Sequence, residues 1–210
     1  HATRAVTRLT DEYQLHEAGR ELYEFIWSEF CDWYIEAAKV RLYGDTPDPV
    51  VAQTLAHVLE RTMPLLHPYM PFVTEDLWQH LPHPGDALIV ATWPEPGAEY
   101  PEAEQFAALK EIVREIRNAR AEHGVDPARR IAATVYPGPL HATFTNLRRE
   151  LESLARLDPD QLQVLDGEVA GDQQGVSIVS GGATILLPMA GMIDVEAERA
   201  RRCGIRVGIS

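Results

Sequence analysis

The stretch ELYEFIWSEFCDWYIEAAKVRLY, from Glu21 to Tyr43, decides the fold of the first part of the chain. Together with the residues just before it, it carries apolar side chains in steps of three, four and five, at Leu15, Ala18, Leu22, Phe25 or Ile26, Phe30, Trp33 and Ala37. This spacing is typical of one face of an amphipathic helix with some slippage. We therefore expect one long helix from Leu15 to about Tyr43.

Helical patterns also flank this long helix. A shorter one precedes it, from about Ala2 to Tyr13, and the long helix ends at GDTPDP, Gly44 to Pro49, because glycine and proline stop helices. In the helix that follows, Asp48 is placed to cap the first turn and Pro49 to occupy its first position. The buried stripe expected for that helix is Val51, Leu55, Val58, Leu59, Thr62 and Leu66.

Prolines then divide the end of this region. Pro64 predicts a kink, and the chain breaks at Pro68 and restarts at Pro71. The side chains available for burial after the restart are Phe72, Leu77, Trp78 and Leu81. Residues 1–82 therefore predict a helical bundle.

A segment rich in proline and glycine, residues 83–101, separates the bundle from a small α/β domain at 102–193. The elements expected in this domain are a helix from Glu102 to about Glu122, a strand from Arg130 to Tyr136, a helix from Leu140 to Leu157, and a hairpin of Val176–Ser180 and Ala183–Leu187 around Gly181-Gly182. Residues 194–210 predict the start of another helix, with Asp194 as its cap. The fold class is therefore α+β.

The charge of the chain excludes a broad electrostatic surface for nucleic acid. The net charge is −13, and residues 1–82, 83–130 and 131–210 carry −7, −3 and −3. Lysine and arginine make phosphate contacts, so an acidic surface repels a polyanion. Any RNA contact must then be a focused one, on a restricted basic strip.

The sequence gives no sign of a membrane segment. No run approaches the roughly 20 apolar residues that span a bilayer, and the first fifteen residues carry charges where a signal peptide would be apolar. Two cysteines, Cys31 and Cys203, form neither a disulfide framework nor a metal-binding pair. We expect a cytoplasmic protein with no membrane partner.

Catalytic signatures are missing from the sequence. It contains no G-x-G-x-x-G, G-x-x-x-x-G-K-[ST], G-x-S-x-G or H-E-x-x-H. His67, His80 and His83 lie close in sequence, but in a proline-broken turn without cysteine or carboxylate partners, which favours surface or capping roles. We predict no catalytic residue, no metal site and no cofactor in this chain.

Six aromatic side chains gather within twelve residues of the long helix: Tyr23, Phe25, Trp27, Phe30, Trp33 and Tyr34. Trp27 and Tyr34 fall partly off the face expected to be buried. An aromatic ring outside the core can stack on an unpaired RNA base or pack against another domain. Both interpretations stay open for these two rings, and packing is the favoured one.

The helix LKEIVREIRNARAEHGVDPARR has sorted charges. Lys110, Arg114, Arg117 and Arg120 lie three or four residues apart on one face, the glutamates lie on another, and the buried face is formed by Leu109, Ile112, Val113 and Ile116. This basic strip, extended by Arg129 and Arg130, is a candidate for contacts with tRNA phosphates. The competing interpretation is a solvated helix surface with weak ion pairs.

These stretches resemble a known family. ELYEFIWSEFCDWYIEAAKVRLY followed by LLHPYMPFVTEDLWQHLP, Leu65 to Pro82, is similar to the anticodon-binding bundle of class I aminoacyl-tRNA synthetases, and the wording around Cys31 to Tyr34 is similar to the valyl-tRNA synthetases. Two later stretches resemble the same family: VREIRNARAEHGVDPARRI, Val113 to Ile131, and ILLPMAGMIDVEAERARR, Ile185 to Arg202.

The resemblance implies a role in reading tRNA. In that family the bundle holds the anticodon stem and loop, a small domain follows it, and a coiled-coil helix begins after that domain. Valine activation with ATP and its transfer to tRNA belong to a catalytic domain that this sequence does not contain. The partners implied are tRNA(Val) and that catalytic domain, with no DNA, and the chain alone is expected to catalyse nothing.

Two features depart from the family pattern. The chain begins partway into the expected bundle, so an earlier helix is expected to be absent, and after Arg202 the sequence CGIRVGIS replaces heptads with glycines and β-branched residues. A bundle that lacks a helix exposes an apolar face. The alternative function is therefore that of a free-standing remnant that acts as a protein interaction module.

Overall fold

The computed structural model describes residues 1–43, 46–83, 85–98, 100, 102–167 and 175–188, and the chain divides into two compact units, His1–Glu99 and Tyr100–Ser210. Each unit has its own core. The segments expected to form a further helix, at 194–210, and the cysteine Cys203 lie outside the described residues.

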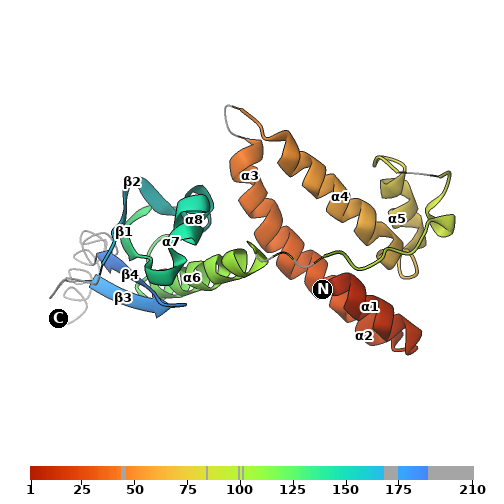
Figure 1. Ribbon diagram of the computed structural model, residues 1–210, viewed down its shortest axis with the longest axis horizontal. Helices are drawn as coiled ribbons and strands as arrows, with labels where there is room; N and C mark the ends of the chain where they lie inside the picture. The colour runs from red at the N-terminus through yellow and green to blue at the C-terminus, as the bar shows by residue number, and fades with distance from the viewer. Residues whose placement is uncertain (44–45, 84, 99, 101, 168–174, 189–210) are drawn as a thin grey trace, which may run out of the picture. The chain divides into compact units, whose positions relative to one another are not determined.

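The first unit is helical, as predicted (Figure 1). Its elements are α1 (Ala2–Asp11), α2 (Leu15–Glu24), the π-helix η1 (Phe25–Ile35), α3 (Glu36–Leu42), α4 (Pro49–Leu66), α5 (Pro71–Trp78) and the 3-10 turn η2 (Leu88–Val90). The Asp48 side chain accepts a hydrogen bond of 2.9 Å from the Val50 amide, which confirms the cap expected at the start of α4. Pro64 lies inside α4 and is buried.

The long helix expected from Leu15 to Tyr43 is continuous but not uniform. Its middle eleven residues, η1, have the wider π geometry. A π turn holds more residues than the 3.6 of an α-helix because its hydrogen bonds join residues five apart. The wider turn explains the slippage in the apolar pattern, in which Phe25 and Phe30 are five residues apart. Within this π-helix Phe30 and Trp33 are both buried.

The core of the first unit joins α1, α2 and α4 through Val6, Leu9, Ala18, Leu22 and Leu65. A second cluster contains Met63, Trp78 and Leu88. The expected burial of Phe72 and Leu77 is wrong: Phe72 is 89% exposed and Leu77 is 47% exposed, because α5 buries the side that carries Thr74 and Trp78.

The proline-rich segment expected as a boundary packs on the first unit over much of its length. Leu88 is buried, the Trp93 indole Nε1 donates to Thr7 Oγ1 at 2.8 Å, and Arg61 donates to the carbonyl of Glu95. Prolines block a helix there, but they do not prevent docking of an extended chain. The division between the units falls near the end of this segment, between Glu99 and Tyr100.

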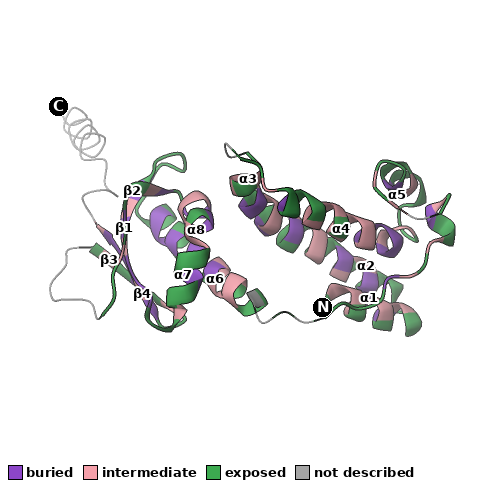
Figure 2. Ribbon diagram, turned by 45° about the horizontal axis from the view of Figure 1, so that its top comes forward, coloured by how far each residue is buried: buried purple, intermediate pink, exposed green. Residues whose placement is uncertain are grey.

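The second unit has a four-stranded mixed sheet with helices on one side (Figures 1 and 2). Its elements are α6 (Glu102–Glu122), β1 (Ile131–Tyr136), the 3-10 turn η3 (Gly138–Leu140), α7 (His141–Asn146), α8 (Arg148–Leu154), β2 (Leu157–Val164), β3 (Gly175–Ser180) and β4 (Ala183–Pro188). The strand order is β2-β1-β4-β3, with β1 parallel to β2 and antiparallel to β4. Figure 2 shows that most positions along β1 and β4, the two central strands, are buried.

The helix expected from Leu140 to Leu157 is partly wrong. It divides into α7 and α8 at Leu147, and the chain then turns into β2, a strand that the sequence pattern did not predict. The register between β1 and β2 shifts between Ile131 and Ala133, which pair with Leu157 and Leu162. An edge strand tolerates this irregularity and the proline at 159, because one side of it makes no ladder hydrogen bonds.

The hairpin of β3 and β4 is confirmed. Ser180 pairs with Ala183, and the two turn residues, Gly181 and Gly182, have φ angles of +59° and +85°. Two positive φ angles in a two-residue loop match the twist of the strands and favour glycine.

Candidate nucleic-acid interface

The predicted sorting of α6 into faces is largely confirmed. Leu109, Ile112, Val113 and Ile116 are fully buried. Arg114 and Arg117 are exposed, and Lys110 is half-buried. Arg120, the expected fourth member of the strip, is buried: only 5% of it is exposed.

Arg120 is therefore a correction to the predicted strip. Its guanidinium donates to the carbonyl oxygens of Arg129 at 2.7 Å, Arg156 at 2.9 Å, Asp126 at 3.1 Å, Ala155 at 3.2 Å and Pro127 at 3.5 Å. Desolvation lowers the pKa of Arg120, the charges of Arg156 and Arg117 lower it further, and Asp126 opposes them. This side chain ties three backbone segments together inside the unit and offers no surface to RNA.

The other arginines of the strip keep surface exposure but are also held by neighbours. Arg117 donates from Nε at 3.0 Å and from Nη2 at 2.9 Å to the carbonyl of Leu154, and Arg114 pairs with Glu111. Arg130 donates to the carbonyl of Leu157 at 2.8 Å. Such backbone contacts fix the direction of a guanidinium without neutralising its charge.

The structure adds one exposed arginine that the sequence pattern did not indicate. Arg156 follows α8, and its backbone lies against Arg120 and Ile131, whose amide donates to the Arg156 carbonyl at 3.2 Å. A signal for it could have come only from predicting β2, since the turn from α8 into β2 brings Arg156 beside Arg129 and Arg130.

The two singled-out aromatics of the first unit differ in exposure. Trp27 is 57% exposed and stacks in parallel on Tyr23, itself 63% exposed, with ring centroids 6.2 Å apart. Tyr34 is half-buried and stacks on Phe30, with centroids 6.0 Å apart. Trp27 and Tyr23 thus present an open aromatic surface, whereas Tyr34 packs toward the core.

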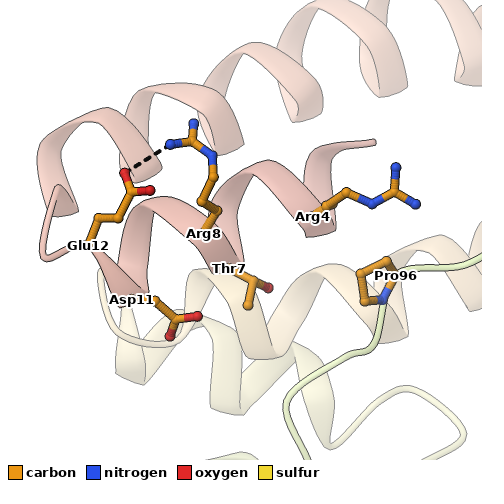
Figure 3. Close-up of a pocket in the computed structure, with 6 residues that line it drawn as sticks. All are labelled: Arg4, Thr7, Arg8, Asp11, Glu12 and Pro96. Atoms are coloured by element: carbon orange, nitrogen blue, oxygen red, sulfur yellow. Dashed lines mark hydrogen bonds and ion pairs between the residues drawn. The ribbon is translucent and has the colours of Figure 1, made fainter.

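A surface hollow on α1, of about 320 Å³, also carries cations. Arg4, Thr7, Arg8, Asp11 and Glu12 line it, with Pro96 opposite them, and Figure 3 shows Arg8 joined to Glu12. The ion pair between Arg8 and Glu12 is 2.9 Å long. Two carboxylates balance the two arginines, so this hollow does not favour a polyanion.

The histidines considered as metal ligands have other partners. His67 Nδ1 lies 2.9 Å from Thr74 Oγ1, His80 Nδ1 lies 2.8 Å from the Asp76 carbonyl, and the His83 ring packs on Trp78 with centroids 4.7 Å apart. Among the described residues, no group of three or more histidines, cysteines and acids is placed to hold a metal ion.

In the part of the chain that the structure describes, no helix has both the length and the apolar character needed to cross a membrane.

Comparison with known proteins identifies the family of this chain. Residues 1–135 match the family described as the anticodon-binding domain of tRNA ligase. Curated relatives include the valine–tRNA ligases of Carboxydothermus hydrogenoformans (44% identical), Geobacillus stearothermophilus (39%) and Halalkalibacterium halodurans (40%), each aligned over 93% of this chain. The chain spans 23% of the length of these relatives. The predicted resemblance to valyl-tRNA synthetases is confirmed, and the chain belongs to the family of anticodon-binding domains of tRNA ligases.

Proposed function

We propose that the chain holds the anticodon arm of tRNA(Val) for a valine–tRNA ligase whose catalytic domain lies in the remaining length of such a protein. The single observation that carries this proposal is the match of residues 1–135 to the anticodon-binding family, together with the names of the curated relatives. Valine activation with ATP belongs to that other domain, and we propose no cofactor for this chain. Its place of action is the cytoplasm, where tRNA is charged.

Holding an anticodon arm requires shape and positioning more than acid-base chemistry, because the reacting end of the tRNA is far from the anticodon. The open pair of Tyr23 and Trp27 suits an unpaired base of the anticodon loop, since every base has a face that stacks on an aromatic ring. The exposed cations of α6, together with Arg129 and Arg130, suit phosphates. Arg120 is not part of this set.

The test of specificity is binding of the chain to a tRNA(Val) transcript and to an unrelated tRNA, followed by fluorescence anisotropy between about 50 and 200 mM salt. We expect tighter binding of tRNA(Val), and loss of that preference when its anticodon is replaced. Equal binding of both tRNAs would overturn the valine assignment. Dimerisation of the chain with no RNA binding would instead favour the protein interaction module.

The aromatic contact is tested separately by Trp27→Ala. Base stacking on an aromatic side chain contributes about 1–3 kcal/mol, so the variant should bind tRNA(Val) about tenfold more weakly. Tyr43→Ala is the matched control, because Tyr43 is also exposed but lies beyond η1. Unchanged affinity in the Trp27 variant would exclude this ring from the RNA contact.

A further inference from the structure

Arg156 has a backbone conformation that normally belongs to glycine. Its φ is +54°, and it directly follows Ala155, the residue that caps the end of α8. The left-handed region strains any residue with a Cβ atom, and helices that end in this way favour glycine there. Arg156 is exposed, and backbone hydrogen bonds hold its conformation: its amide donates to the Ser153 carbonyl at 3.3 Å, and its carbonyl accepts from Arg120 and from the Ile131 amide.

Three exposed arginines rise from neighbouring backbone positions around this residue: Arg129, Arg130 and Arg156, which we name the arginine junction. The Arg120 guanidinium holds the carbonyl of Arg129 at 2.7 Å and that of Arg156 at 2.9 Å. The Arg130 guanidinium donates a hydrogen bond to the carbonyl of Leu157, the residue after Arg156. One buried cation thus fixes the backbone that carries three exposed ones.

The electrostatic setting of the junction is positive. The charges of Arg156 and Arg117 both lower the pKa of Arg120, because the three guanidinium groups lie close together. Asp126 and Asp158 are the carboxylates nearby, and both accept hydrogen bonds from neutral amides and keep their charge. The guanidinium groups of Arg117, Arg120, Arg129, Arg130 and Arg156 outnumber these two carboxylates. Clustered like charges repel one another, and a bound anion relieves that repulsion.

We propose that the arginine junction binds the phosphodiester backbone of RNA, as a contact on the second unit that reads no base. Planar guanidinium groups match phosphate oxygens with paired hydrogen bonds, and a held backbone reduces the entropy lost on binding. Arg120 acts as a positioning residue, and Arg156 occupies a glycine-like position for the sake of its charge. This inference rests on the proposed tRNA-binding function and adds a site to it.

The backbone strain at Arg156 provides a clean variant. Arg156→Gly removes the charge and also the strain, so the fold should unfold at the same or a higher urea concentration than the parent chain. Arg129→Ala removes a second cation from the junction. Arg149→Ala is the matched control, because Arg149 is an exposed arginine of the same unit that lies in the first turn of α8, whereas Arg156 follows the end of that helix.

The measurement is the salt dependence of binding to tRNA(Val) and to an unrelated tRNA. Each junction variant should flatten the slope of log affinity against log salt by about one unit, and the double variant by about two. The double variant should bind both tRNAs about tenfold more weakly, whereas Arg149→Ala keeps the parent slope. A backbone contact weakens both RNAs alike, because it carries no sequence information.

The outcomes separate this inference from the proposed function. If the parent chain does not discriminate between the tRNAs but the double variant flattens the slope for both, the junction stands and the valine assignment fails. If tRNA(Val) is preferred and the double variant keeps the parent slope, the assignment stands and the junction is overturned. A slope lowered equally by Arg149→Ala would also overturn it, because the effect would then be one of net charge.

Discussion

Different internal contacts stabilise the two units of the chain. The second unit closes around a buried cation, Arg120, which ties the end of α6, the loop at 126–129 and the turn from α8 into β2. The first unit is joined by hydrogen bonds nearer its surface, such as those of Tyr69 and Glu75, and leaves apolar side chains such as Phe72 exposed. The two units thus differ in the polar contacts that close them: a buried cation in the second, and hydrogen bonds beside its apolar clusters in the first.

The largest expected effect that sharpens this comparison is that of Arg120→Met. Methionine fills a similar volume but removes the donor of the Arg129 carbonyl. The carbonyls of Asp126 and Arg156 keep only their backbone donors, the amides of Arg129 and Ile131. Hydrogen bonds to charged groups contribute about 1.5–3 kcal/mol each, and losses within one network are not additive. We expect the second unit to lose about 3 kcal/mol of unfolding free energy.

The two units can be followed separately in that experiment, because all four tryptophans, Trp27, Trp33, Trp78 and Trp93, lie in the first unit. Tryptophan emission in urea reports the first unit, and hydrogen exchange of the β1 amides reports the second. The variant should speed exchange in β1 and leave the tryptophan transition in place, whereas Arg114→Met, on the exposed face, should change neither. A common shift of both probes would show that the units unfold together and would break the comparison.

The sequence predicted most of the elements whose patterns are local. The helix Glu102–Glu122 and the hairpin turn at Gly181 and Gly182 follow from apolar spacing and from glycine, both of which act within a few residues. The strand β2 could not be predicted in this way. Its stretch LDPDQLQV contains a proline and two aspartates, and it is a strand because β1 pairs with it.

The candidate site shows the same limit. The spacing in α6 identified its basic face correctly, but it could not show which residues of that face other segments cover. Arg120 is covered by the backbone at 126–129 and 155–156. Arg156 was missed because its place depends on the missed strand. Trp27 was singled out correctly as lying off the buried stripe, and its stacking partner Tyr23 lies four residues earlier, a spacing that brings two side chains together on one helix face.

A smaller effect is expected in the first unit for Tyr69→Phe. The Tyr69 hydroxyl donates to the Leu15 carbonyl at 2.8 Å and joins the turn before α5 to the start of α2. Burial raises the pKa of Tyr69, which keeps the hydroxyl as a donor. Losing one neutral hydrogen bond costs about 1 kcal/mol. The tryptophan transition should therefore move to lower urea while β1 exchange is unchanged, and an unchanged transition would show that this contact is dispensable.

The smallest effect expected is a pH dependence confined to the first unit, through Glu75. Its carboxylate accepts from Gln79 Nε2 at 2.8 Å and from the Leu88 amide at 2.9 Å, and these bonds, in that order, hold its pKa below the ordinary value of 4.5. A carboxyl with a lowered pKa in the folded state stabilises the fold above the ordinary value and loses that contribution as pH falls through the folded value.

The first unit should therefore unfold more readily as the pH is lowered below about 4.5, and Glu75→Gln should flatten that dependence. The amide keeps an acceptor for the Leu88 amide but cannot titrate. Asp76→Asn is the control, because Asp76 is the adjacent exposed acid and its substitution should leave the slope in place. If tryptophan emission in urea shows the same slope for the Glu75 variant and the parent chain, the tie between α5 and η2 does not depend on the carboxylate charge. The first unit would then be stabilised by apolar packing, as the second unit is apart from Arg120. The buried cation Arg120 would remain as the difference between the two units.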